Sequence, residues 1–174
     1  ELVSTILSTN QNTSLNEDRS RLAALESASM GTETPIEVHA NKEFAKHLEV
    51  QSWLPMAAEE YAISPNINDY VVVPVIIAPT DLPNRNSVSF PYETLIKFNP
   101  RQGRLNYKSW VGKPTYTEHN HFKLEEAKGI VFDTYMTKLN HAKGHIHKVV
   151  ALCGFDRTKD RELATQILKG QRKS

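Results

Sequence analysis

The sequence predicts an α+β fold, built on an antiparallel or barrel-like sheet and preceded by a polar N-terminal arm. Several β-branched apolar runs lie in the C-terminal two thirds of the chain, few helical segments separate them, and no regular alternation of strand and helix occurs. The 174 residues are enough for one domain of ordinary size with an arm. We therefore expect a single main core.

The arm is defined by its composition. The first 34 residues contain 14 Ser, Thr or Asn, and a segment with so little to bury cannot offset the entropy of its own ordering. A short helix is expected over residues 41–50, where Phe44, His47 and Leu48 follow helical spacing. We place the arm at residues 1–60, with short helices, and the domain proper at residues 61–174.

The next elements follow along the chain. Residues 70–77 are apolar on both faces and predict a buried strand, in which Pro74 indicates a bulge or a sheet edge because it has no N–H to donate. A loop over residues 81–86 leads to a short helical piece near residues 92–98, and a turn covers residues 99–103. Residues 107–116 read as an extended stretch, broken at Gly112 and Pro114.

The C-terminal elements are the clearest. Residues 130–138 and 145–153 predict two strands of a hairpin with a polar connection. A final helix follows, with Thr158 as the expected cap and Gly170 as the stop signal. Its apolar stripe consists of Leu163, Ala164, Ile167 and Leu168.

Charge is divided unevenly along the chain. Residues 1–87 carry a net charge of −7 and residues 88–174 a net charge of +8, which together give the overall +1. The basic residues are scattered singly, without the aromatic or glycine-rich interleaving of nucleic-acid binding motifs. The opposite charges could dock one half on the other, or could give the C-terminal half a basic face for an acidic partner. Ordinary solvated faces are the favoured interpretation, and no nucleic-acid partner is expected.

Two further classes are disfavoured. A single cysteine, Cys153, excludes an intrachain disulfide, and its apolar neighbours predict a buried, inert thiol. No apolar run reaches the roughly 18 residues of a membrane span, and no charged-then-apolar leader is visible, so neither a membrane partner nor secretion is expected.

Four of the seven histidines form two His-x-His pairs, and an extended backbone would send both members of a pair to one face. The pairs could supply a zinc-like site, with Glu118 or Asp133 as an oxygen ligand. Ordinary surface histidines are the favoured interpretation, and we expect no metal and no cofactor. The four residues of the metal alternative are His119, His121, His145 and His147.

An ordered series of motifs resembles the head-maturation (prohead) proteases of large tailed bacteriophages, over residues 61–174. The motifs are Pro83-Asn84-Arg85-Asn86 with Phe90, Tyr107-Lys108-Ser109-Trp110-Val111-Gly112-Lys113-Pro114, Glu118-His119-Asn120, Ala127-Lys128-Gly129-Ile130-Val131-Phe132-Asp133 and Phe155-Asp156-Arg157-Thr158-Lys159-Asp160. These proteases are related in fold to the herpesvirus assemblins. The resemblance implies a serine endopeptidase with a small antiparallel β-barrel flanked by helices.

The resemblance also implies residue roles. His119, after the Gly-Lys-Pro segment, would be the general base, and we choose Asp133 as the third, orienting group. The nucleophile would be a Ser in a Ser-x-Gly motif after the helix-ending glycine, which points to Ser174 or to a residue just beyond it. We accordingly expect the chain to be truncated at its C-terminus.

The family cleaves scaffold proteins, capsid proteins and its own propeptides after Glu, inside the assembling prohead in the host cytoplasm. The implied partners are therefore scaffold and capsid proteins, with self-association and retention in the virion left open. Candidate self-processing motifs here are Gly31-Thr32-Glu33, Ala24-Leu25-Glu26 and Ala58-Glu59-Glu60. Two alternatives remain: a non-catalytic virion structural protein that keeps the protease fold, and the His-rich metal-binding domain.

Overall fold

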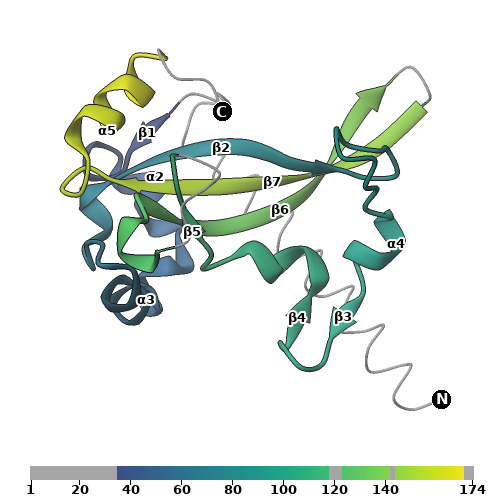
Figure 1. Ribbon diagram of the computed structural model, residues 1–174, viewed down its shortest axis with the longest axis horizontal. Helices are drawn as coiled ribbons and strands as arrows, with labels where there is room; N and C mark the ends of the chain where they lie inside the picture. The colour runs from purple at the N-terminus through teal and green to yellow at the C-terminus, as the bar shows by residue number, and fades with distance from the viewer. Residues whose placement is uncertain (1–34, 118–122, 142–143, 171–174) are drawn as a thin grey trace.

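A five-stranded antiparallel sheet forms the centre of the molecule (Figure 1). The computed structural model describes residues 35–117, 123–141 and 144–170, with the side chains of 139–141 and 145 outside the description. The sheet order is β1-β2-β7-β6-β5, and this arrangement confirms the predicted α+β class and antiparallel sheet. The strands are β1 (Ile36–Glu37), β2 (Tyr70–Pro79), β5 (Pro114–Thr115), β6 (Gly129–His141) and β7 (Gly144–Asp156).

The sheet is open within the described part of the chain. Its edge strands β1 and β5 are two residues long each and do not pair with one another there. Strands of two residues present few backbone N–H and C=O groups through which the two edges of a sheet could pair and close it. The coarse fold class is therefore as expected, while the described residues do not complete a barrel.

Pro74 occupies a free edge of β2. Arg157 N donates to Asp69 O, and this bond fixes the pairing phase up to Ile76, so that Val71, Val73 and Val75 bond to β7 while Val72, Pro74 and Ile76 point to the opposite edge. β1 covers that edge only at Val71 and Val72, so the missing donor of Pro74 interrupts no pairing among the described strands. The predicted edge is confirmed, but the register shift lies between Ile76 and Ala78, not at Pro74.

β6 and β7 form the predicted hairpin as two 13-residue strands that extend beyond the rest of the sheet (Figure 1). The register shifts between Val131 and Asp133. This bulge changes the side-chain phase, because Ile130, Phe132 and Tyr135 all enter the same buried cluster although strict alternation would turn Tyr135 away from it.

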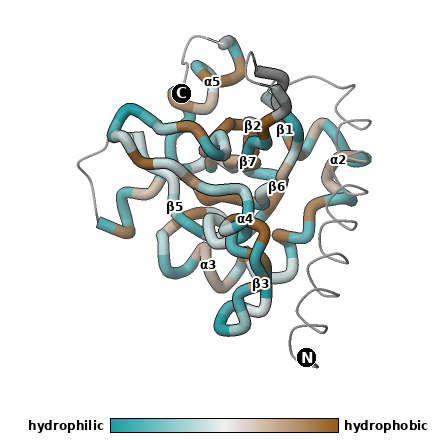
Figure 2. The backbone as a smooth tube through the Cα atoms, turned by 90° about the vertical axis from the view of Figure 1, so that its right-hand side faces the viewer, coloured by the Kyte–Doolittle hydropathy of each residue, from teal (hydrophilic) through white to brown (hydrophobic). Residues whose placement is uncertain are grey.

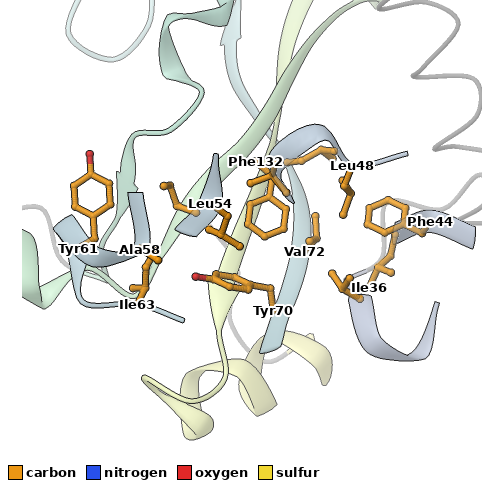
Figure 3. Close-up of a cluster of buried hydrophobic side chains, with 14 of the residues drawn as sticks. Ile36, Phe44, Leu48, Leu54, Ala58, Tyr61, Ile63, Tyr70, Val72 and Phe132 are labelled. Atoms are coloured by element: carbon orange, nitrogen blue, oxygen red, sulfur yellow. The ribbon is translucent and has the colours of Figure 1, made fainter. Parts of the chain in front are cut away.

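The main core lies between the sheet and the helices α2 (Lys42–Lys46) and α3 (Leu54–Tyr61). Figure 3 shows Tyr70 and Phe132 near its centre, with ring centroids 5.0 Å apart. Side chains from Ile36 onward belong to this core. The packed unit therefore begins earlier than Tyr61, where the sequence predicted the domain to start, and residues 1–34 of the expected arm lie outside the described residues.

α5 (Arg161–Leu168) and α3 lie on opposite sides of the strands (Figures 1 and 2). Leu163, Ala164 and Ile167 pack against Val71, as predicted. Leu168, the fourth member of the predicted stripe, is exposed instead. The cap prediction was wrong: Asp160, not Thr158, accepts the hydrogen bond of Leu163 N, at 2.9 Å. Thr158 instead donates its hydroxyl to Asp156.

The segment predicted as extended begins with a 3-10 helix, Asn106–Trp110, before reaching β5. This turn directs Tyr107 into a second buried cluster, which also contains Leu105 and Val149. Nearby, α4 (Tyr92–Leu95) and the ribbon of β3 (Phe98–Asn99) and β4 (Arg104–Leu105) agree with the predicted short helix and turn. None of the described helices is long and apolar enough to cross a membrane.

Candidate active site

His119 lies outside the described residues, within the five-residue gap between Thr117 and Lys123. We call residues 116–123 the base connection. Its entry is held along β6: Thr115 and Pro114 pair with Gly129 and Ile130, and Lys128 N donates to Thr115 O at 2.7 Å. The chain that enters the base connection is thus fixed by the backbone of β6.

The same attachment continues upstream. Gly112 N donates to Val131 O and Val131 N donates to Lys113 O, each at 2.9 Å. Tyr61 Oη donates to Gly112 O at 3.3 Å, which joins α3 to this segment. Burial raises the pKa of Tyr61, and the nearby Glu60 and Tyr116 raise it further, so its hydroxyl remains a donor at neutral pH.

The exit of the base connection is fixed by Lys159. The 3-10 helix Leu124–Glu126 follows Lys123, and Lys159 Nζ donates to Glu125 O at 2.5 Å and to Ala62 O at 2.9 Å. Lys128 and Asp160 add an ion pair at 3.3 Å, with about 70% of each side chain removed from solvent. The exit therefore lies beside the turn that precedes α5.

α5 carries the chain toward Ser174, which also lies outside the described residues. Asp160 caps its first turn, and Gly170 ends it with φ +67°, a left-handed conformation that glycine adopts without strain. Three residues then separate Gly170 from Ser174.

Asp133 is described and nearly buried, and its carboxylate contacts a lysine. Asp133 Oδ1 accepts from Lys108 Nζ at 3.0 Å and from Thr134 N at 2.8 Å. The structure therefore shows Asp133 in a buried ion pair, whereas His119 and Ser174 are outside the described residues. Of the three residues predicted for the site, Asp133 alone has an observed environment.

Sequence reasoning missed a polar centre at the junction of β7 and α5. Asp156, 2% exposed, accepts from Ser64 N at 2.7 Å, from Thr158 N at 2.9 Å and from Thr158 Oγ1 at 2.6 Å. Tyr70 Oη donates to Ser64 O at 2.7 Å. Burial, and then the carboxylates of Asp156 and Asp69, raise the pKa of Tyr70. The sequence analysis had singled out the Phe155–Asp160 motif, which contains Asp156 and Thr158. It could not show that Ser64 and Tyr70 complete the centre, because these residues belong to a distant segment of the chain.

The metal alternative gains no geometry from the described residues. His119 and His121 lie outside them, as does the side chain of His145. His147 stacks on Tyr92, with ring centroids 4.0 Å apart and planes 20° apart. No group of three His, Cys, Asp or Glu side chains that could hold a metal occurs in the part of the chain that the structure describes.

Cys153 lies buried in β7, packed beside Val131 and Ala151. Burial raises the pKa of its thiol to about 11, so the thiolate is scarce at neutral pH. This agrees with the prediction that Cys153 is a packing residue and a poor nucleophile.

Comparison of the chain with protein-family models, with curated proteins and with solved structures finds no match.

Proposed function

We propose that the protein is a serine endopeptidase of the phage head-maturation type, with His119 as general base and Ser174, or a Ser just beyond it, as nucleophile. The observation that carries this proposal is the attachment of the base connection to the turn before α5. Lys159 bonds to Glu125 O, and Lys128 pairs with Asp160, so the chain that bears His119 and the helix that leads to Ser174 share one anchor.

Chain lengths support this pairing of base and nucleophile. His119 lies four positions before Lys123, and Ser174 lies four positions after Gly170. Each such stretch can span at most about 14 Å, and an eight-residue helix is about 12 Å long. The covalent geometry therefore permits the imidazole to meet the hydroxyl beside α5.

The proposed chemistry needs no cofactor. His119 accepts the hydroxyl proton while the serine oxygen attacks the scissile carbonyl carbon, and it then gives that proton to the leaving amine. Water, deprotonated by the same imidazole, hydrolyses the acyl-enzyme and regenerates the serine. The proposed substrates are scaffold and capsid proteins and the chain's own N-terminal region, cleaved after Glu within the assembling prohead.

A closed barrel is also part of this proposal. The resemblance implies one, whereas the described sheet has free edges at β1 and at the outer half of β2. Further strands would be required to close it.

The proposal is tested by intact-mass and N-terminal sequencing of the natural full-length product, compared with His119→Ala and Ser174→Ala. We expect wild type to trim itself after a Glu such as Glu33, and His119→Ala to remain whole. His145→Ala is the matched control, because the base role is assigned to the other His-x-His pair, and it should trim normally.

A synthetic peptide of residues 27–39 provides a second substrate, with Glu33→Gln in the peptide as its control. Cleavage of the first peptide and not of the second supports the specificity for Glu. Absence of trimming in wild type, even with scaffold protein added, would leave the non-catalytic virion protein as the better assignment.

A further inference from the structure

Basic side chains that are far apart in the sequence gather at one end of the molecule, which we call the basic end. It consists of the loop 81–91, α4, the β3–β4 ribbon and the outer parts of β6 and β7, on the right of Figure 1, whereas α3 and α5 lie on the left. Its described residues 79–106, 136–138 and 146–149 include six Lys or Arg and two Asp or Glu, an excess of four positive charges. The six basic residues are Arg85, Lys97, Arg101, Arg104, Lys138 and Lys148.

Hydrogen bonds and a ring contact join the parts of the basic end. Thr80 N donates to His147 O at 2.8 Å, and His147 N donates to Thr80 Oγ1 at 3.0 Å, so β7 holds the start of the loop. The ring of Tyr92 in α4 stacks on His147. Asn106 Nδ2 donates to Thr94 O at 2.9 Å, which ties the β3–β4 ribbon to α4. The basic end is therefore a connected surface and not a set of independent loops.

The positive charges of the basic end are accessible to a partner. Arg85, Lys97, Arg101 and Lys138 are exposed, and the other two side chains are half-buried. Among the described residues, the ion pairs involve none of these six side chains. A partner with negative charge can therefore approach them without displacing an ion pair between described residues.

The opposite side of the molecule carries the opposite charge. Residues 35–78, which include α2 and α3, contain six Asp or Glu and two Lys or Arg. The charge asymmetry of the sequence is thus a separation in space. Such a field attracts a polyanion to the basic end and repels it from the other side.

The surface chemistry favours nucleic acid over an acidic protein. Among the described residues, five large hydrophobic side chains are exposed, and Val88 is the one that belongs to the basic end. Protein interfaces usually depend on a buried apolar centre, whereas a phosphate backbone is held by separate Lys and Arg side chains. Half of the six basic residues are Arg, whose guanidinium group matches the geometry of phosphate oxygens.

We propose that the basic end binds the phosphate backbone of double-stranded DNA, independently of base sequence. Duplex DNA is the partner because it carries one negative charge per ~1.7 Å of its axis, a density that side chains spread over several elements can meet at many points. The sequence by itself does not predict a nucleic-acid partner, because its basic residues are scattered singly and lack a known binding motif. The fold removes the first of these objections. The inference goes beyond the proposed function and does not depend on it.

The test is fluorescence anisotropy of a labelled 20-base-pair DNA duplex, titrated with the natural full-length product at two salt concentrations. We expect a Kd of about 1 µM in about 50 mM salt, and an affinity that falls by up to about 1,000-fold in about 200 mM salt. With at most six phosphates neutralised, the slope of log K against log salt should be about −5. A Kd above about 100 µM in the lower salt, or an affinity that does not change with salt, would overturn the proposal.

A pair of matched variants locates the surface. Lys97→Gln with Arg101→Gln removes two charges from the basic end, and we expect binding about 10-fold weaker or more and a slope of about −3.5. Lys42→Gln with Lys169→Gln is the control, because it lowers the net charge equally through exposed residues of α2 and the end of α5. The control should bind as wild type does. Equal weakening in the two variants would assign binding to net charge alone and refute the site.

A competition experiment separates DNA from an acidic protein partner. A peptide of 20 glutamates should displace the duplex only at about 10-fold higher concentration of negative charge or more. Displacement at equal charge concentration would refute DNA as the partner and favour an acidic protein surface. An inactive wild type that binds the duplex as expected would refute the proposed protease and support the DNA site. An active protease without such binding would do the reverse.

Discussion

Gly129 in β6 and Gly154 in β7 approach so closely that a Cβ atom on Gly129 would overlap the carbonyl group of Gly154. A Cβ atom on Gly154 would in turn meet the ring of Phe132. The two glycines lie just before the bulge in β6, at the point where β5, β6 and β7 are side by side. Close backbone approach at Gly129, and contact with an aromatic ring at Gly154, are the reasons for glycine at these positions, which are not turns.

We predict that Gly129→Ala destabilises the fold by about 3 kcal/mol or more, because the obstacle is backbone that cannot move without breaking the sheet. Gly154→Ala should cost less, about 1–3 kcal/mol, because a ring can shift. Gly103→Ala is the control: its φ is +68° but nothing lies within 4 Å of the added atom, so about 1 kcal/mol is expected. Urea denaturation of the three variants measures this order, and equal losses would contradict the steric explanation.

Asp156 is predicted to be essential for stability. Asp156→Asn places an amide donor against the donors of Ser64 or Thr158, because both carboxylate oxygens now accept hydrogen bonds. The expected loss is about 3 kcal/mol in the free energy of unfolding. Asp69→Asn is the matched control, since its partner Ser64 Oγ is a hydroxyl that can rotate. A loss below about 1 kcal/mol for both variants would show that the centre at Asp156 does not hold α5 and β7 together.

The capping role of Asp160 is tested at the start of α5. Asp160→Ala removes the acceptor of Leu163 N and should cost about 1 kcal/mol. Asp160→Asn keeps the cap but loses the charge that pairs with Lys128, so it should retain most of the stability. Amide exchange at Leu163 distinguishes the two effects. Equal exchange in Asp160→Ala and wild type would mean that another group caps the helix.

Cys153 is predicted to make the folded protein less stable as the pH rises above about 9. Its pKa is about 11 in the folded protein and 9.0 in the reference thiol, so the unfolded chain loses this proton first. The stabilising contribution is complete below pH 9 and is lost between about pH 9 and pH 11, with a slope of at most about 1.4 kcal/mol per pH unit. The free energy of unfolding, taken from denaturation curves measured at several pH values in this range, should fall less steeply with pH for Cys153→Ala than for wild type. Identical pH dependence in the two proteins would contradict the assignment.

Much of the strand and helix order could be predicted from local pattern. The hairpin of β6 and β7 is marked by two apolar, β-branched runs around a polar turn, and α5 by an apolar stripe that ends at Gly170. The residues that failed prediction are those whose partners are distant in sequence. Thr158 has the residue type of a helix cap but donates its hydroxyl to Asp156. Residues 106–110 form a 3-10 helix instead of a strand, with Tyr107 buried in a cluster whose other members come mostly from other segments.

At the candidate site, too, the sequence indicated individual residues but not their distant partners. The sequence singled out Asp133 and the two motifs that contain Lys108 and Lys159, but not the contacts that these lysines make. Lys108 meets Asp133 across 25 positions of chain, and Lys159 reaches Ala62 across 97. A charge pattern along one strand cannot reveal such partners.

The sequence by itself determined the class of fold, the hairpin, the C-terminal helix and the burial of Cys153, because each depends on the spacing of apolar residues over a few turns or strand positions. Tertiary structure alone decided where the core begins, which residue caps α5 and where the carboxylate of Asp133 is directed. These outcomes depend on which distant groups satisfy buried donors, acceptors and charges, and that choice is made only when the segments pack together.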